Sequence, residues 1–298
     1  MTLPALLLLL TAAAPQRALV PDPPKACDSC AEWNKDREPF RVFGNTYFVG
    51  VDGLGAVLIT SDAGLILLDG GLTESAPLID AHIRKLGFRP ENIRLIVNSH
   101  AHYDHAGGIH ALQVLSGAQV AASPDGARAL EQGSPVAADP QFAFGAEANG
   151  FPAVPHVRVV RDGETLTVGT LGVTAHFVPG HTPGSTTWTW KSCEGARCLN
   201  MVYADSLTAV SAPGFRFSGD ASHPSLEAGF RASIATVAAL PCDVLLATHP
   251  GFLAMDEKLA ARVKSPGTNP FVDPGACRAY AERAARGLDE RLAEERKP

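Results

Sequence analysis

The sequence predicts an α/β fold with two similar halves and one site at an edge of its sheets. Predicted strands and helices alternate along most of the 298 residues, and this order is typical of layered α/β proteins. The second half of the chain repeats the element order of the first half, although not its residues. Polar residues follow directly on several predicted strands, at the carboxyl ends where open α/β sheets bind their ligands.

The first half begins at residues 40–50, where aromatic and β-branched residues favour strands. In residues 75–87 apolar residues recur with helical spacing and Gly87 ends the pattern. The elements expected here are strands at 40–50, two strands in 56–71 around a turn at 62–64, a helix at 75–87, a strand at 92–100, a helix at 107–117 and a strand at 118–123.

The second half has the same kinds of elements. Residues 133–155 are rich in Gly, Pro, Ala and Phe without periodicity, which predicts a long loop of the kind that is frequently functional. The tail from Cys277 is charged, and Tyr280, Ala284, Leu288 and Leu292 lie along one face of a predicted helix. The other expected elements are strands in 164–180, at 186–190 and at 198–206, a helix at 226–240 and a strand at 242–251.

Composition and the chain start set further limits. A formal net charge of −6 makes a broad basic surface for nucleic acid unexpected. Residues 1–18 hold a short apolar run followed by small residues, which predicts an export signal, although no Lys or Arg precedes the leucines. The run is too short to span a bilayer, and no later segment is long and apolar enough. We expect residues 19–39 to be a loose arm, residues 40–298 to be one domain, and the protein to be a periplasmic monomer.

The six cysteines agree with export, because disulfides form in oxidising compartments. We favour a Cys193–Cys198 bridge, since the segment CEGARC can turn back on itself. A Cys242–Cys277 bridge would tie the start of a strand to the final helix. Cys27 and Cys30 form a CxxC pattern without a βαβ context, so a local bridge or two free thiols are expected rather than a redox centre.

Four of the ten histidines lie within residues 98–110. In the segment HAHYDH, His100 and His102 are two apart, so an extended chain presents both on one side. Asp104 and His105 follow after the chain has begun to turn and can face the same crevice from another direction. This arrangement favours two adjacent metal ions over one.

Other predicted strands end in similar residues. His181 follows the strand near 173–178, Asp205 and Ser206 follow the strand near 199–204, and His249 follows the strand at 243–247. Imidazole and carboxylate ligands suit zinc. The remaining histidines are expected to be surface or packing residues rather than ligands, and they are His82, His110, His156, His176 and His223.

These residues resemble the metallo-β-lactamase superfamily, whose motif is HxHxDH. The stretches TAHFVPGHTPGSTTWTW, MVYADSLTA and ALPCDVLLATHPG are similar, more narrowly, to subclass B3 metallo-β-lactamases, and the resemblance spans about residues 40–285. It implies the αββα sandwich of the metallo-β-lactamase fold, with a metal site at one edge of the sheets. It also implies that residues 40–298 form a metallo-hydrolase domain.

The resemblance implies two Zn²⁺ ions and a specific ligand set. His100, His102 and His181 match the first zinc site, and Asp104, His105 and His249 match the second. Where other lactamase subclasses place a Cys, this chain has Ser206, as subclass B3 does. One pairing partner that some relatives have is replaced by Asp52, which leaves Cys30 as the partner for Cys27.

The implied reaction is hydrolysis of the β-lactam amide bond of penicillins, cephalosporins and carbapenems. A metal-bound hydroxide is the expected nucleophile, because zinc lowers the pKa of bound water to near neutrality. Asp104 is the expected residue that orients it, and Ser206 and Thr208 match the family's substrate-carboxylate contacts. Phe215 takes the place of a Tyr that some relatives carry.

Two segments are expected to flank the substrate groove, residues 137–154 and residues 209–217. Aromatic residues in these segments offer apolar contact to substrate side chains, although anchoring of the loops to the core is an equal alternative. They are Phe142, Phe144, Phe151 and Phe215.

Other functions stay open from the sequence alone. A glyoxalase II-type thioesterase, lactonase or phosphodiesterase of the same fold would use Asp205 to bridge the metals. A non-catalytic zinc-binding envelope protein would have fully coordinated ions with no open position. A redox protein working through Cys27 and Cys30 would not need the histidines, and the acidic charge and export signal disfavour a nuclease.

Overall fold

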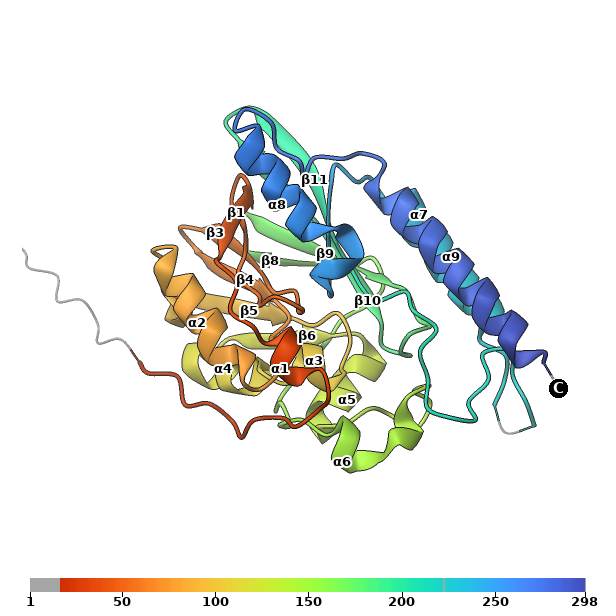
Figure 1. Ribbon diagram of the computed structural model, residues 1–298. Helices are drawn as coiled ribbons and strands as arrows, with labels where there is room; N and C mark the ends of the chain where they lie inside the picture. Colours follow the sequence, from red (N-terminus) through yellow and green to blue (C-terminus); the bar gives the residue numbers. More distant parts are fainter. Residues whose placement is uncertain (1–16, 222, 298) are drawn as a thin grey trace, which may run out of the picture.

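Two sheets pack face to face in the computed structural model, which describes residues 17–221 and 223–297 (Figure 1). The predicted export signal, apart from its last two residues, therefore lies outside the described residues. In the described part, the first sheet has seven strands in the order β1 (Phe40–Phe43), β2 (Thr46–Phe48), β3 (Val57–Ser61), β4 (Gly64–Leu68), β5 (Ile93–Val97), β6 (Gln119–Ala122) and β7 (Arg158–Val159). The second has five, in the order β12 (Val244–Ala247), β11 (Arg197–Ala204), β10 (Thr186–Glu194), β9 (Leu171–Phe177) and β8 (Thr165–Val168).

Helices cover the outer face of each sheet. Figure 1 shows α2 and α4 on one side of the molecule and α7 and α9 on the other. The helices and turns of the described chain are α1 (Cys30–Trp33), α2 (Ser75–Lys85), η1 (Pro90–Asn92), α3 (Tyr103–Ala106), α4 (Ile109–Ser116), α5 (Pro124–Gln132), η2 (Phe142–Phe144), α6 (Gly145–Asn149), α7 (Glu227–Ala239), η3 (Pro250–Leu253), α8 (Met255–Lys264) and α9 (Ala276–Glu295). No helix in the described residues has both the length and the apolar character to span a membrane.

Three apolar layers explain this arrangement. Between the sheets, Ile66 of β4 and Trp188 of β10 belong to one buried cluster. Ile83 of α2 packs with the outer face of the first sheet, and Phe230 of α7 and Leu288 of α9 pack with the outer face of the second. Each sheet is thus buried on both faces, which matches the near-continuous apolar runs of its parallel strands. The predicted αββα sandwich is confirmed.

The structure differs from the sequence prediction at several places. Helices α5 and α8 and the short strand β7 were not predicted. The expected long loop at 133–155 contains the turn η2 and the short helix α6. The arm at 19–39, expected to be loose, forms α1 and packs Cys30 and Trp33 against Val51, Leu54 and Leu72. Apolar burial fixes this arm, although its Pro-rich composition is typical of flexible segments.

Three disulfides link the described cysteines: Cys27–Cys30, Cys193–Cys198 and Cys242–Cys277. The second closes the β10–β11 hairpin, where the two cysteines are paired across the ladder. The third ties the residues before β12 to the first turn of α9. No free cysteine is found in the described residues.

Candidate metal centre

Strands from both sheets end at one edge of the sandwich. His100 follows β5 by three residues, His181 follows β9 by four, and His249 follows β12 by two. The two sheets are joined beside these residues, because the Trp188 indole Nε1 donates to the Asn98 carbonyl at 3.0 Å. The carboxyl ends of strands far apart in the chain therefore meet at one crevice, as expected for open α/β sheets.

The HAHYDH segment folds into the tight helical turn α3. The His105 and Ala106 amides donate to the His102 carbonyl, at 3.0 and 2.8 Å. The following chain passes so close to β4 that a Cβ on Gly108 would lie 2.3 Å from the Gly70 carbonyl oxygen. Glycine is therefore required here, and the turn carries its side chains into the crevice.

Three imidazoles form the first group. His100, His102 and His181 are buried, and each offers a ring nitrogen within 4.8 Å of the others. The His100 ring centroid lies 4.8 Å from those of both His102 and His181. Three convergent imidazoles with this spacing match a zinc site that keeps an open position.

A second group lies beside the first. His105 Nε2 is 3.2 Å from Asp104 Oδ2 and 3.3 Å from His249 Nε2. His249 Nε2 is 3.5 Å from Asp104 Oδ2. His100, Asp104 and His105 also offer ligand atoms within 4.8 Å of one another, so His100 adjoins both groups. All six sequence-predicted ligands are therefore brought together.

Two carboxylates orient two of the three rings of the first group. His100 Nδ1 lies 2.6 Å from Asp205 Oδ1, and His102 Nε2 lies 3.1 and 3.2 Å from the two Asp139 oxygens. The opposite nitrogen of each ring is left to face the crevice. His100 Nε2 is buried without a hydrogen-bond partner in the described structure. Such carboxylate–histidine pairs accompany metal ligands, and an unpartnered buried nitrogen fits a metal.

Backbone carbonyls orient two further rings. His181 Nδ1 bonds to the Thr208 carbonyl at 2.9 Å, and His249 Nδ1 bonds to the Gly53 carbonyl at 3.1 Å. Each bond requires the proton on Nδ1, so Nε2 carries the lone pair. The tautomer in both rings is therefore the one that can bind a metal through Nε2.

The charge states of four of these side chains suit metal binding. Burial lowers the pKa of His181 and of His249 to about 4, and lowers that of His100 well below its usual value. These imidazoles are neutral at pH 7, the form that binds metal. Burial alone would raise the pKa of Asp104, but His105 and His249 lower it well below its usual range, so it is a carboxylate. Burial would lower the pKa of His105, but the Asp104 carboxylate raises it.

Asp69 is a buried carboxylate that the sequence analysis missed. It follows β4 directly, with a positive φ of 60°. It accepts hydrogen bonds from the Ser99 amide at 2.7 Å, the Asn98 side chain at 3.0 Å and the Tyr203 hydroxyl at 2.8 Å. Burial raises its pKa to about 6, although nearby His105 lowers it. Asp69 therefore ties the strand ends together beneath the site, and its place after a strand was the available signal.

Asp139 was also missed. It lies in the predicted long loop, 37 residues from the His102 ring that it orients, and it is 5% exposed. No strand or motif precedes it in the sequence. Only the folded loop brings it to the site.

Ser206 and Thr208, the predicted substrate contacts, differ in their exposure and in their hydrogen-bond neighbours. Ser206 is 1% exposed, and its hydroxyl is 2.9 Å from that of Thr248. Thr208 is half-buried, its hydroxyl is 3.1 Å from His181 Nδ1, and it lines a cavity of about 250 Å³. Phe252, which lines the same cavity, contacts the His249 ring at 5.1 Å between centroids.

The four loop aromatics divide into two pairs. Phe142 and Phe144 are 48% and 44% exposed, so they are free to contact a substrate. Phe151 packs against the apolar cluster between the first sheet and its helices. The Phe215 ring packs against that of Phe217, with 5.3 Å between centroids. Anchoring of the loops therefore accounts for the second pair.

Histidines expected to be non-ligands have other partners. His82 bonds to the Val49 carbonyl and Asp36, and His110 bonds to Asp22. His176 Nε2 is 2.9 Å from the Thr189 hydroxyl. Neither group of possible metal ligands found among residues 17–221 and 223–297 contains these histidines, His156 or His223.

Comparison with known proteins identifies the family. The family model for the metallo-β-lactamase superfamily, which describes sequences, matches residues 49–249 of this chain. Among solved structures, the Rm3 metallo-β-lactamase is 51% identical with a TM-score of 0.88, covering 91% of this chain and 100% of that one. MEM-A1, a subclass B3 metallo-β-lactamase from a soil metagenome library, is 50% identical with a TM-score of 0.84, covering 88% and 98%.

More distant relatives agree. BJP-1, a subclass B3 metallo-β-lactamase of Bradyrhizobium japonicum, is 34% identical with a TM-score of 0.80, covering 90% of this chain and 98% of that one. A curated protein of Burkholderia pseudomallei, described as a probable metallo-hydrolase, is 31% identical over 39% of this chain and 36% of its own length. The chain thus matches about a third of that curated relative. It belongs to the metallo-β-lactamase superfamily of hydrolases and is similar, within it, to the subclass B3 enzymes.

Proposed function

We propose that this protein hydrolyses the amide bond of β-lactam antibiotics, namely penicillins, cephalosporins and carbapenems, with two Zn²⁺ ions. The observation that carries the proposal is the convergence of five imidazoles and one carboxylate at one crevice, with four of the rings oriented from behind. The subclass B3 names of the similar structures support the choice of substrate.

The ligand sets follow from the two groups of side chains. His100, His102 and His181 are proposed to hold the first ion, and Asp104, His105 and His249 the second. Three ligands for each ion leave positions open for water and substrate. Bound zinc supplies a water-derived nucleophile at neutral pH and polarises the carbonyl group of the substrate.

The chain's own residues then act around the reacting bond. Hydrolysis adds a hydroxyl group to the lactam carbonyl carbon and a proton to the ring nitrogen as the C–N bond breaks. The Asp104 carboxylate is proposed to hold and orient the attacking water. Thr208, which lines the cavity of about 250 Å³, is proposed to contact the substrate carboxylate. Ser206 is proposed as a second contact, and the exposed Phe142 and Phe144 are proposed to offer apolar surface to substrate side chains.

The position of Asp205 argues against the related hydrolases that bridge two metals with an Asp. Its Oδ1 accepts from His100 Nδ1, the ring nitrogen that faces away from the crevice. Asp205 belongs to neither group of possible ligands in the described residues. This placement favours the lactamase over a thioesterase, lactonase or phosphodiesterase.

Export to the periplasm is part of the proposal. The three disulfides support it, because such bridges persist in oxidising compartments.

The test is an assay of the zinc-loaded protein with a carbapenem and a chromogenic cephalosporin, with and without a chelator. Turnover that the chelator abolishes and zinc restores is the expected result, and His181→Ala should lower kcat/KM by several orders of magnitude. Absence of turnover with two zinc ions bound would reject the lactamase and leave a different hydrolase of this superfamily. Full turnover in the presence of chelator would reject the metal mechanism itself.

A further inference from the structure

We propose that the segment 25–34, closed by the Cys27–Cys30 disulfide, is a brace that positions His249 and thereby sets the affinity of the second metal position. Trp33 is the positioning residue within this brace. The inference rests on the two-ion centre proposed above. It concerns residues outside the ligand set. They lie in the N-terminal arm, which the sequence composition predicts to be loose but which packs against the body of the protein.

The first link joins the brace to the carbonyl that orients His249. The Gly53 carbonyl accepts from His249 Nδ1 at 3.1 Å, and the Gly53 amide donates to the Trp33 carbonyl at 2.9 Å. The neighbouring Asp52 amide donates to the Lys35 carbonyl at 2.9 Å. The turn that holds His249 is therefore itself held by α1.

The second link is direct contact of side chains. The Trp33 and His249 rings lie 5.5 Å apart between centroids. Both residues line a cavity of about 540 Å³ that also includes Gly53. A Cβ on Gly53 would lie 2.5 Å from Trp33 Cδ1, so the two segments are in close contact. Loss of the indole would remove its contacts with the His249 ring and with Gly53, while the backbone hydrogen bonds to the turn would stay.

Apolar packing joins α1 to the body of the protein, and the disulfide restrains the chain at the start of this helix. Cys30 is 5% exposed and belongs to a buried cluster with Val51, Leu54 and Leu72, which Trp33 and Cys27 also contact. The helix α1 has only four residues, too few to be stable alone. The bridge restrains the chain at the start of α1, where the Cys30 amide also donates to the Cys27 carbonyl at 3.2 Å.

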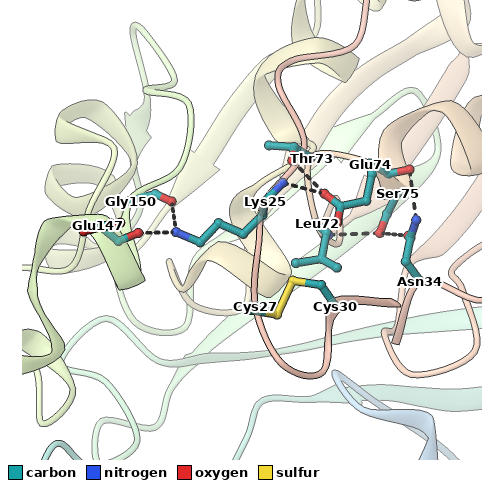
Figure 2. The surroundings of a disulfide bond; sticks show 10 residues. All are labelled: Lys25, Cys27, Cys30, Asn34, Leu72, Thr73, Glu74, Ser75, Glu147 and Gly150. Carbon is teal, nitrogen blue, oxygen red and sulfur yellow. Dashed lines mark hydrogen bonds between the residues drawn. A yellow bond between two sulfur atoms is a disulfide. The ribbon is translucent and has the colours of Figure 1, made fainter. Parts of the chain in front are cut away.

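Both ends of the brace are anchored, as Figure 2 shows. Before the bridge, Lys25 Nζ donates to the Glu147 carbonyl at 2.7 Å and the Gly150 carbonyl at 3.0 Å, at the end of α6. After the bridge, the Ser75 hydroxyl donates to Asn34 Oδ1 at 2.6 Å. With its ends fixed to α6 and α2, the segment between them depends on the disulfide for its shape.

The test measures zinc binding, separately from catalysis. Stepwise Zn²⁺ affinity is determined for the full chain by competition with a chromogenic chelator, and Co²⁺ absorption spectra report ligand geometry. In the double variant Cys27→Ala/Cys30→Ala, one of the two dissociation constants should rise about tenfold or more, while the other stays within about twofold, as expected for loss of a contact that orients a ligand of one ion. The matched control is Cys193→Ala/Cys198→Ala, which removes another short-range bridge at the β10–β11 hairpin. It should leave both constants unchanged.

A second pair of variants keeps the bridge intact. Trp33→Ala should weaken the same step, and Trp33→Phe, which keeps an aromatic ring against His249, should restore most of it. Wild-type affinity in Trp33→Ala would overturn the brace, as would an equal rise of both constants or the same change in the hairpin control. Failure of the wild-type protein to bind zinc at all would instead reject the proposed function, and with it the site that the brace serves.

Discussion

Asp205 lies behind His100 and determines how that ring faces the crevice. Its Oδ1 is 2.6 Å from His100 Nδ1, and both side chains are fully buried. Asp205→Asn keeps the shape of the side chain but removes its negative charge, which makes His100 a poorer zinc ligand. We expect the affinity for the first zinc ion to fall about tenfold to a hundredfold. Chelator competition measures this change.

The control for this prediction is Asp289→Asn, which removes an exposed carboxylate paired with Arg231. It should leave zinc affinity unchanged, because exposed ion pairs contribute little. Unaltered zinc binding in Asp205→Asn would mean that the ring is held by its packing alone.

Residues of the site differ in how far the sequence predicts them. His181 and His249 could be identified because each lies within four residues of the end of a strand. Asp139 could not, since its contact with His102 depends on how the loop 133–155 folds, and loop conformation has no periodic pattern. Gly53 was equally hidden, because its role depends on its backbone carbonyl, and Trp33 was hidden because its contact with the His249 ring depends on how the arm packs.

At the scale of elements, the end of α9 holds the backbone at Phe217 and Ser218 in place. Glu295 accepts from the Phe217 and Ser218 amides at 2.8 and 2.9 Å and from Arg291 at 2.8 Å. Burial alone would raise the pKa of Glu295, but the hydrogen bonds from Arg291 and from these two residues lower it to about 2. The folded pKa lies below the usual value of 4.5 for a glutamate, so this stabilisation is complete above that pH and is lost as the pH falls toward 2.

Glu295→Gln should therefore lower the free energy of unfolding at pH 7 by about 1.5–3 kcal/mol, the usual contribution of hydrogen bonds to a charged group. The difference between variant and wild type should shrink between pH 5 and pH 3. Urea unfolding at several pH values measures it. A difference that stays constant down to pH 3 would show that the charge of Glu295 is not the cause.

Two disulfides offer a second comparison between elements. Cys242–Cys277 closes 35 residues and joins β12 to α9, whereas Cys193–Cys198 closes five within a hairpin. Since a longer closed loop restrains the unfolded chain more, Cys242→Ala/Cys277→Ala should cost about 2–5 kcal/mol of stability. Cys193→Ala/Cys198→Ala should cost less. Equal losses in urea unfolding would contradict this chain-entropy argument.

Among the elements, the sequence pattern identified most strands and the helices α2, α4, α7 and α9. The helix α5 went unpredicted although its ends carry standard signals, since Ser123 caps it, Pro124 opens it and Gly133 ends it in the left-handed region. The helix α8 lacks such a start, because its N-cap is Ala254 with a positive φ of 50°. Its remaining signals are the acidic Asp256 and Glu257 in the first turn and the basic Arg262 and Lys264 in the last.

At the scale of the whole molecule, the proposed ions join the two sheets. His100, His102, Asp104 and His105 follow a strand of the first sheet, whereas His181 and His249 follow strands of the second. Each proposed zinc site takes ligands from both sides. Metal binding therefore requires the two halves to be packed together, and it should stabilise that packing.

Zinc removal should consequently destabilise the entire fold. A ligand that binds only the folded state at 100 times its dissociation constant contributes about 2.7 kcal/mol, so two saturated sites should contribute about 5 kcal/mol. We expect chelator-treated protein to unfold at a lower urea concentration with an unchanged slope, and zinc to reverse the shift. His181→Ala should lose only the part that belongs to the first ion, since its ring lies with His100 and His102. Unfolding at the same urea concentration with and without zinc would mean that the sandwich alone holds the six side chains in place, because ions that stabilised the packing of the two sheets would shift the midpoint.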